Sequence, residues 1–224
     1  MIGRLKKKIR SAFMKRSYSL DRLDVQILPY LNFRGGFFIE VGANDGLRYS
    51  NTLYFEKYLG WKGLLIEAIP ALFEKCRENR PKCQTVNCAL VSRDYTEKII
   101  EMRYCNLMSV VKGGLNSEEE ELSHIKRGRA FLSQNEGTYI VRVPARKLSD
   151  VLEEHHIQYV DLLSLDVEGY EAEVLKGIDF DRHRIEHMLI EARHRENVEA
   201  VIGRLYAPIA SLETSCFDIL YRRR

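Results

Sequence analysis

Hydrophobic side chains along this chain follow two alternating patterns: short apolar runs that favour strands, and apolar residues three or four apart that favour helices. The clearest runs are Phe37–Val41, Gly63–Glu67, Gln84–Leu90, Tyr159–Leu165 and His187–Ile190. Helix-like stretches lie between them at residues 53–59, 70–79, 148–155 and 170–176. Strands that are apolar on both faces and separated by helices are typical of a buried parallel sheet. The pattern therefore predicts an α/β fold with a doubly wound, mostly parallel sheet.

The remaining segments are less regular. Tyr95–Arg103 and Thr138–Val143 are predicted strands, and the opposed charge runs between them, at residues 118–121 and 126–129, indicate a solvated helix or a mobile lid. After residue 190, the sequence predicts a helix at Asn197–Tyr206 and a final strand at Cys216–Tyr221.

The first segment places apolar residues at helical spacing among basic ones, with Ile2, Leu5, Ile9 and Phe13 on one stripe. We interpret residues 1–16 as a basic amphipathic helix, which either contacts an anionic membrane surface or packs its stripe on the domain. A second helix is expected within residues 18–33. The predicted division is a helical arm at 1–33 and one α/β domain at 34–224.

Charge is unevenly distributed along the 224 residues, although the net charge is only +3. Residues 1–16 carry seven basic side chains and no acid, and residues 222–224 are all Arg. Removing those ten positive charges leaves −7 for residues 17–221. An acidic body disfavours nucleic acid as a partner.

The spacing of the cysteines and the length of the apolar runs indicate the cellular compartment. The five cysteines form no C-x-x-C pair, which favours free thiols in a reducing cytosol. No apolar run reaches the length of a membrane span, and no apolar core follows the basic start as in a signal peptide. The expected location is cytoplasmic, with peripheral membrane contact if the arm binds lipid.

Acidic residues stand at the carboxyl ends of four of the five clearest predicted strands: Glu40, Glu67, Asp166 with Glu168, and Glu191. In an open α/β sheet, ligands bind beyond the carboxyl ends of the strands. Glu40 in such a position repels phosphate and suits a cationic group, such as a sulfonium or an amino group. Glu67 is placed to accept hydrogen bonds from both hydroxyls of a ribose.

The first strand is followed by Gly42-Ala-Asn-Asp-Gly46, where glycine permits a sharp turn and a close approach of the backbone to a ligand. This spacing differs from the G-x-G-x-x-G of dinucleotide enzymes, and no P-loop is present. A cofactor without phosphates is therefore favoured.

Two blocks of sequence resemble the FkbM-type family of S-adenosylmethionine-dependent methyltransferases. The first comprises FIEVGANDG at 38–46, the stretch 49–70 and NCALVS at 87–92; the second, at 142–180, surrounds D-V-E-G at 166–169. The resemblance implies a Rossmann-like methyltransferase fold that uses S-adenosylmethionine to methylate a hydroxyl oxygen. It assigns Gly42, Asn44, Asp45 and Gly46 to the amino-acid part of the cofactor, Glu67 to the ribose, Ala68 and Ala89 to the adenine, and Asn51 to the methionine end.

The same resemblance places Asp166 and Glu168 next to the methyl group and the acceptor. Methyl transfer to an alcohol needs a base, and a carboxylate serves only if its pKa is raised. We expect one of the two to be that base, with Glu168 preferred; alternatively, Glu168 caps the next helix and Asp166 only contacts the cofactor. A divalent metal held by Asp166, Glu191 and His194 is a further alternative, without assignment.

Several functions remain open. The favoured acceptor is a hydroxyl of a sugar, glycan or glycolipid, and the alternative is a polyketide-type or other natural product. A nicotinamide-dependent oxidoreductase and an inert cofactor-binding module are less favoured. Methylation of nucleobase amines is disfavoured, because residues 166–169 contain no Pro-Pro-aromatic run.

Overall fold

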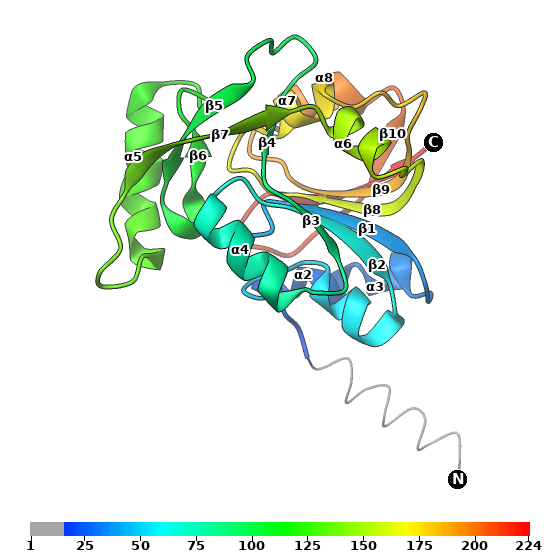
Figure 1. Cartoon of the computed structure of the whole chain (residues 1–224). Coiled ribbons are helices and arrows are strands. Elements are labelled where there is room, and N and C mark those ends of the chain that lie inside the picture. The colour runs from blue at the N-terminus through cyan, green and yellow to red at the C-terminus, as the bar shows by residue number, and fades with distance from the viewer. Residues whose placement is uncertain (1–15) are drawn as a thin grey trace.

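The computed structural model describes residues 16–224, whose centre is a seven-stranded sheet in the order β10-β11-β9-β8-β1-β2-β3 (Figure 1). The parallel strands are β1 (Phe37–Val41), β2 (Lys62–Ile66), β3 (Gln84–Val86), β8 (Tyr159–Leu165) and β9 (Arg184–Glu191). β11 (Asp218–Arg223) pairs antiparallel with β9, and β10 (Tyr206–Ser211) pairs antiparallel with β11. Strand order reverses between β1 and β8. This topology confirms the predicted Rossmann-like, doubly wound and mostly parallel sheet.

Helices cover both faces of the sheet because its central strands are apolar on both sides. Ile39 of β1 packs in one buried cluster with α6 (Leu148–Glu154), α7 (Glu171–Lys176) and α8 (Arg195–Ile202). Its neighbour Phe38 packs in another cluster with η2 (Phe55–Leu59) and with Cys76 of α4 (Pro70–Asn79). Successive residues of a strand point to opposite faces, so one apolar run supplies two cores.

Residues 18–33, expected to be one helix, form three short pieces: η1 (Leu20–Arg22), α2 (Leu23–Gln26) and α3 (Leu28–Leu31). Positive φ angles at Asp21 and Arg22 break the first boundary, and Pro29, which lacks an N–H, stands in the first turn of α3. The buried apolar side chains of this segment join the Phe38 cluster. The predicted basic helix lies outside the described residues except for Arg16, and the domain division at residue 33 stays a prediction.

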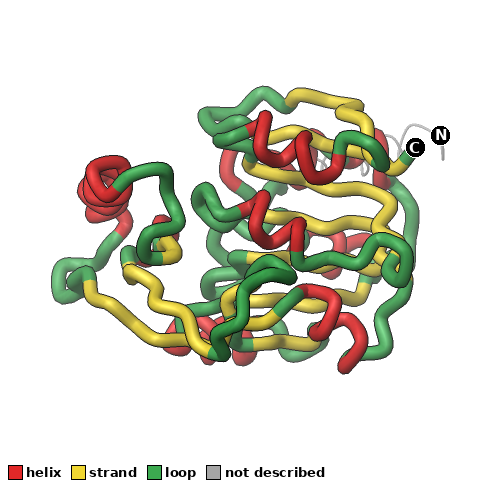
Figure 2. Tube along the Cα trace, turned by 90° about the horizontal axis from the view of Figure 1, so that it is seen from above, coloured by secondary structure: helices red, strands yellow, loops and turns green. Residues whose placement is uncertain are grey.

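A separate lobe, residues 99–146, stands beside one end of the main sheet (Figure 2). It contains β5 (Ile99–Tyr104), η3 (Asn106–Met108), β6 (Val110–Val111), α5 (Glu118–Gly128), η4 (Arg129–Phe131) and β7 (Tyr139–Arg146). With β4 (Ala89–Leu90), its strands form a second sheet in the order β4-β7-β5-β6. The opposed charge runs thus lie on and just after a helix.

Two predicted elements were wrong in detail. The run Gln84–Leu90 is two strands in different sheets, since the Asn87 amide donates to the carbonyl oxygens of Glu67 and Ala68 and the chain leaves the main sheet there. The helix expected at Asn197–Tyr206 ends at Ile202, and β10 follows, a strand that the apolar pattern did not indicate. β10 lies at the sheet edge, where Pro208 is tolerated.

Residues 16–224 contain no helix with the length and apolar character that crossing a membrane requires. All five cysteines are free thiols, as expected.

Candidate active site

A cavity of about 830 Å³, part of it open to solvent, lies at the carboxyl ends of β1, β2 and β8, where the strand order reverses. The lobe supplies the opposite wall through residues of β5, η3 and β6. The residues predicted from the sequence that line it are Glu40, Gly42, Asn44, Glu67, Ala68, Ala89, Asp166 and Glu168. Asp45, Gly46 and Asn51 do not line it.

Both glycines of the first turn are required by space as well as by conformation. Gly42 has a φ of +79°, and a Cβ there would lie 2.0 Å from the carbonyl oxygen of Asp166. Gly46 has a φ of +78°, and a Cβ there would lie 2.8 Å from Cγ of Arg80. Between them, the Asp45 carboxylate accepts the N–H groups of Leu47 and Arg48. Asp45 and Gly46 therefore shape the turn from behind the cavity wall.

Backbone strain is concentrated around the cavity. Seven non-glycine residues among the described ones have positive φ, and four of them line it: Asn44, Tyr49, Asn106 and Glu168. Such conformations persist only where the surroundings impose them, and they cluster at functional sites.

Glu67 is buried at the end of β2, and both carboxylate oxygens are held by backbone. Oε2 accepts the N–H of Asn44 and Oε1 accepts that of Ile69, each at 2.8 Å. Since each carboxylate oxygen accepts more than one hydrogen bond, acceptor capacity remains for a ligand in the cavity. Burial raises the pKa of Glu67 to about 7, against the opposing effect of the N–H groups that it accepts.

Glu40 anchors the loop that follows the glycine turn. Its carboxylate accepts the hydroxyls of Ser50 and Thr52, at 2.8 and 2.6 Å, and the N–H of Asn51 at 2.7 Å. The amide nitrogen of Asn51 donates to the Ser164 hydroxyl at 3.1 Å, and its Oδ1 is buried without a hydrogen-bond partner. These contacts hold the loop against β1 and β8.

Arg80, which the sequence did not single out, ties the same loop to α4. Its side chain is 1% exposed. The guanidinium is paired with Glu56, donates to the carbonyl oxygen of Gly46 at 2.9 Å, and lies 3.8 Å from Glu40. One buried cation thus compensates two carboxylates and fixes the end of the turn.

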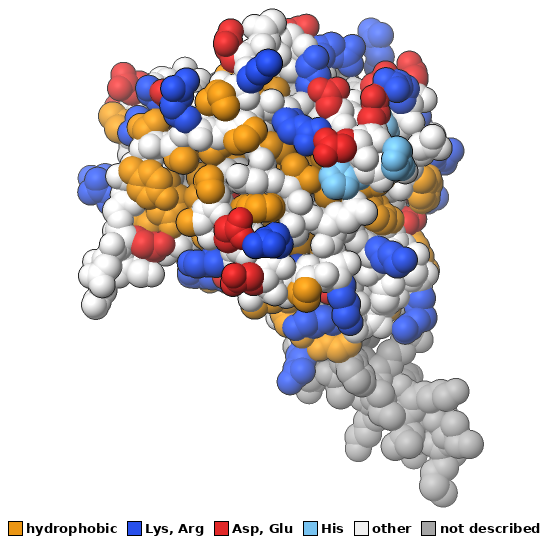
Figure 3. Space-filling view, in the orientation of Figure 1, with side chains coloured by type: hydrophobic (Ala, Val, Ile, Leu, Met, Phe, Trp, Pro, Cys, Tyr) orange, Lys and Arg blue, Asp and Glu red, His pale blue; other side chains and the backbone are white. Residues whose placement is uncertain are grey.

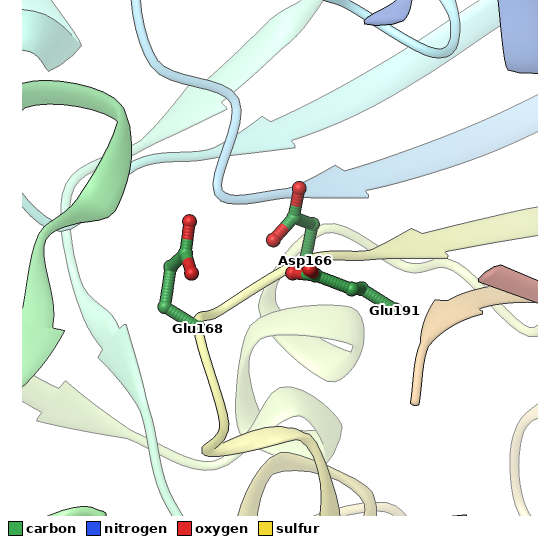
Figure 4. Close-up of side chains that lie close together, drawn as sticks. All are labelled: Asp166, Glu168 and Glu191. Carbon is green, nitrogen blue, oxygen red and sulfur yellow. The ribbon is translucent and has the colours of Figure 1, made fainter. Parts of the chain in front are cut away.

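Three carboxyl groups converge at the ends of β8 and β9 (Figure 4). Oxygens of Asp166, Glu168 and Glu191 lie within 4.8 Å of one another. Desolvation, followed by the charges of Glu191 and Glu168, raises the pKa of Asp166 well above its ordinary value. Burial and Glu191 raise that of Glu168 to about 8, while Arg193 opposes the shift. Asp166 opens to the cavity, whereas Glu168 is mostly covered.

The metal site that the sequence suggested, with Asp166, Glu191 and His194 as ligands, does not form. His194 lies outside the carboxylate cluster, with Nε2 3.8 Å from Glu120 and 3.3 Å from the Asn116 amide. Glu168 takes its place, and Arg193 pairs with both Glu168 and Glu191. That guanidinium supplies the compensating charge that a cation would bring, so we assign no metal.

Among the described residues that line the cavity, Arg48 is the one Lys or Arg, and the sequence analysis did not single it out. Its guanidinium carbon lies 5.1 Å from the ring centre of Tyr49 and 6.0 Å from that of Phe131. Such cation–π contacts orient the guanidinium without neutralising it. A cavity rich in carboxylates therefore also presents one positive charge.

Comparisons with known proteins match most of this chain. The family model of the methyltransferase FkbM domain matches residues 40–211, which include every residue lining the cavity. The methyltransferase sdnD of Sordaria araneosa is 28% identical over 233 aligned positions, which cover 95% of this chain and 84% of that protein.

Two solved structures show more distant similarity. A methyltransferase FkbM from Methylobacillus flagellatus KT has a TM-score of 0.49 and 10% identity over 95% of this chain and 57% of its own. A TehB-like SAM-dependent methyltransferase from Corynebacterium glutamicum has a TM-score of 0.42 and 10% identity over 100% of this chain and 96% of its own.

Proposed function

This chain belongs to the FkbM methyltransferase family, and from that premise we propose that it transfers the methyl group of S-adenosylmethionine to a hydroxyl oxygen of a sugar, glycan or glycolipid. The observation that carries the proposal is the cavity itself. At one side it presents Glu67, with acceptor capacity for a ribose, and at the other it presents Asp166 with its two neighbouring carboxyl groups.

The methyl donor fits the charges of this cavity. Glu67 would accept the two ribose hydroxyls, and Ala68 and Ala89 would border the adenine. The amino-acid part would lie along Gly42 and Asn44, with Arg48 facing its carboxylate. Asp45, Gly46 and Asn51 would act through the shape of the turn, and Glu40 through the loop that it holds.

The transfer itself is an in-line displacement, in which the acceptor oxygen attacks the methyl carbon as the sulfonium becomes a neutral thioether. Alignment of the three reacting atoms contributes up to about 7–11 kcal/mol. The alcohol proton must also be removed, and a positioned base contributes roughly 100- to 10,000-fold. A carboxylate with a raised pKa suits that step better than an ordinary one.

Asp166 is the better placed base in this geometry. Its side chain opens to the cavity, whereas the Glu168 carboxylate is paired with Arg193. We therefore place the base at Asp166 and give Glu168, preferred from the sequence, the role of neighbour that raises the pKa of Asp166.

The other residues that line the cavity suit a saccharide as the acceptor. Tyr49 and Tyr170 offer rings for stacking, and Asn106 and Ser109 offer hydrogen-bonding groups. The alternative acceptor, a polyketide-type or other natural-product hydroxyl, demands the same chemistry and a less polar wall. If residues 1–16 contact an anionic surface, a cytoplasmic enzyme would be held near membrane-linked acceptors.

The test combines binding with transfer. We expect S-adenosylhomocysteine to bind the purified protein in calorimetry and NAD to give no heat. Labelled S-adenosylmethionine should label an acceptor in a saccharide or glycolipid fraction of cell extract; label confined to other small molecules would favour the alternative acceptor.

The variant Asp166→Asn should bind S-adenosylhomocysteine within about threefold of wild type and lose transfer by roughly 100-fold or more. Glu168→Gln should lose less. Full transfer by Asp166→Asn would defeat the assignment of the base, and NAD binding without S-adenosylhomocysteine binding would favour an oxidoreductase.

A further inference from the structure

Arg193, just after β9, contacts three different parts of the molecule through its three guanidinium nitrogens. Nη2 pairs with Glu168, Nε lies 3.2 Å from Oε1 of Glu191, and Nη1 lies 3.0 Å from Nδ1 of His124. Glu168 and Glu191 are the two carboxyl groups that flank Asp166 (Figure 4). Each nitrogen thus serves a separate partner, and two of these partners belong to the proposed catalytic cluster.

His124 is the third partner, and its hydrogen bonds define its tautomer. Nε2 lies 3.1 Å from the carbonyl oxygen of Met108, which can only accept, so Nε2 carries the hydrogen. Nδ1 is therefore the acceptor for Arg193. Burial, together with Arg193, lowers the pKa of His124 to about 4, so the ring is neutral near pH 7. His124 is a fixed acceptor at zero exposure.

The contact links two parts of the fold, because His124 belongs to α5 of the lobe. The apolar side of α5 packs within the lobe, where Ile125 joins Cys105 and Val110. Toward the main sheet, α5 and the nearby Asn116 make polar contacts with Arg193 and His194. The Arg193 guanidinium thus joins the lobe that forms one wall of the cavity to the carboxylate cluster, and Nε2 of His124 also lies 3.6 Å from Oε2 of Glu168.

Glu168 also needs support from outside its own turn. Its φ is +58°, which is costly for a residue with a side chain, and Gly169 follows with a φ of +104°. Glu171 braces the turn by accepting the N–H groups of Val167 and Gly169. Arg193 holds the other end of Glu168, its carboxylate.

The positive charge of Arg193 also affects how easily the carboxyl groups ionise. Asp166, Glu168, Glu191 and Glu171 place four carboxyl groups in one region, and Arg193 is the cation in direct contact with two of them. Arg127 of α5 acts on Glu168 more weakly. Loss of the Arg193 charge would make the cluster harder to ionise.

We propose that Arg193 is a positioning residue for methyl transfer, which holds Glu168 and Glu191 beside Asp166 and, through His124, makes that arrangement depend on the docking of α5. This inference rests on the proposed function, because it assumes that the cluster lies next to the sulfonium of the methyl donor. Arg193 touches no reacting atom; it acts through the carboxylates that it orients.

The test uses two cofactor forms and no acceptor. S-adenosylmethionine and S-adenosylhomocysteine differ by one methyl group and one positive charge, so the ratio of their affinities reports the charge of the cluster. Because both carry the same ribose, the contribution of Glu67 cancels. Calorimetry between pH 6 and 9 should show the preference for S-adenosylmethionine growing as the carboxyl groups ionise.

In Arg193→Met, the preference for S-adenosylmethionine over S-adenosylhomocysteine should begin to rise at a pH about one unit or more higher than in wild type. The affinity for S-adenosylhomocysteine itself should change little. Arg193→Lys keeps the charge and should shift the rise less. Arg195→Met, which removes an exposed cation two residues away that pairs with Glu199, should leave the curve unchanged.

His124 variants test the link to α5. His124→Asn keeps an acceptor near the position of Nδ1 and should retain the wild-type curve, whereas His124→Leu removes it and should shift the rise in the same direction as Arg193→Met. A purely structural role predicts equal effects of both substitutions, with lower affinity for both cofactor forms and no shift in pH.

An unshifted curve for well-folded Arg193→Met would overturn the inference and leave the proposed function standing. If that variant does not fold, equal curves for the two His124 variants would overturn it. Absence of binding of either cofactor form to the wild-type protein at every pH would instead defeat the proposed function, and the inference with it.

Discussion

Glu67 is one residue with two roles: its buried carboxylate holds the backbone around it, and we propose that it also binds the cofactor. Its two oxygens tie the glycine turn, through the N–H of Asn44, to the start of α4, through the N–H of Ile69. Its remaining lone pairs can accept hydrogen bonds from a ligand in the cavity that it lines. Because burial raises the pKa to about 7, the side chain changes charge near neutral pH.

We predict that affinity for S-adenosylhomocysteine rises as pH increases from 6 to 8. Ribose hydroxyls donate hydrogen bonds, and the ionised carboxylate accepts them more strongly than the protonated acid. The gain should be present above the pKa of about 7 and lost below it. Glu67→Gln should bind roughly 10- to 100-fold more weakly and show a flat profile, measured by calorimetry.

Glu74→Gln, an exposed substitution on α4, is the control and should follow the wild-type profile. A wild-type affinity that does not change between pH 6 and 8 would contradict the role given to Glu67. Ordinary surface carboxylates titrate well below this range, so they do not produce such a profile.

Elements rather than single residues decide the shape of the cavity wall. The loop after β1 is held from one side by Glu40 and from the other by Arg80, which directly follows α4. Arg80 contacts Glu56 of η2 as well, so one guanidinium connects a strand end, two helices and a turn. A buried ion pair adds little stability as a whole, but removal of one partner leaves the other charge buried and unpaired.

Arg80→Met should therefore destabilise the protein by about 3–5 kcal/mol, measured as the free energy of unfolding in urea. Arg77→Met on the same helix removes a solvent-exposed pair with Glu74 and should leave the unfolding midpoint unchanged. Equal midpoints for the two variants would show that the Arg80 contacts do not hold the loop.

At the scale of the whole molecule, charge separates the body from the chain ends. The cavity is lined by carboxylates with one arginine, whereas residues 1–16 are strongly basic. An acidic cavity attracts a cationic methyl donor, and a basic segment attracts an anionic lipid surface. The proposed cofactor binding and the proposed membrane contact would need opposite charges, and these charges lie in separate parts of the sequence.

The membrane proposal predicts that the full chain sediments with vesicles that contain anionic lipid and not with neutral ones. Replacement of Lys6, Lys7 and Lys8 by Gln should lower the partition coefficient on the order of 100-fold, since each charge contributes about 1 kcal/mol near the surface. The matched control replaces Lys62, Lys75 and Lys82, three exposed residues of the domain. Equal recovery of both triple variants would rule against the proposal.

The main sheet could be predicted from the sequence because its rules are local. A strand that is apolar on both faces, as at Tyr159–Leu165, is recognisable within seven residues, and its predicted bounds match β8. The turn at Gly42 could be predicted for the same reason, since glycine is the residue that adopts a φ of +79° without strain. The second need for glycine, the Asp166 carbonyl oxygen 2.0 Å from where a Cβ would lie, appears only in the folded chain. The carboxylates then follow from their places after the strands.

Other features depend on partners far away in the chain. The break in Gln84–Leu90 needs the second sheet to pair with Ala89, and β10 needs the neighbouring β11. Nothing in the sequence distinguishes three further residues from ordinary polar surface residues, because their partners are distant in the chain. These residues are Arg80, Arg193 and His124. Arg193 and His124, for example, are 69 positions apart.

The sequence by itself therefore determined the class of fold, the glycine turn and the row of acidic strand ends, because sterics and alternating burial act over a few neighbouring residues. Tertiary structure decided which carboxyl groups meet, which cations compensate them and which of the two candidates opens to the cavity. Those outcomes depend on desolvation and on distances between side chains, and neither exists until distant segments pack together.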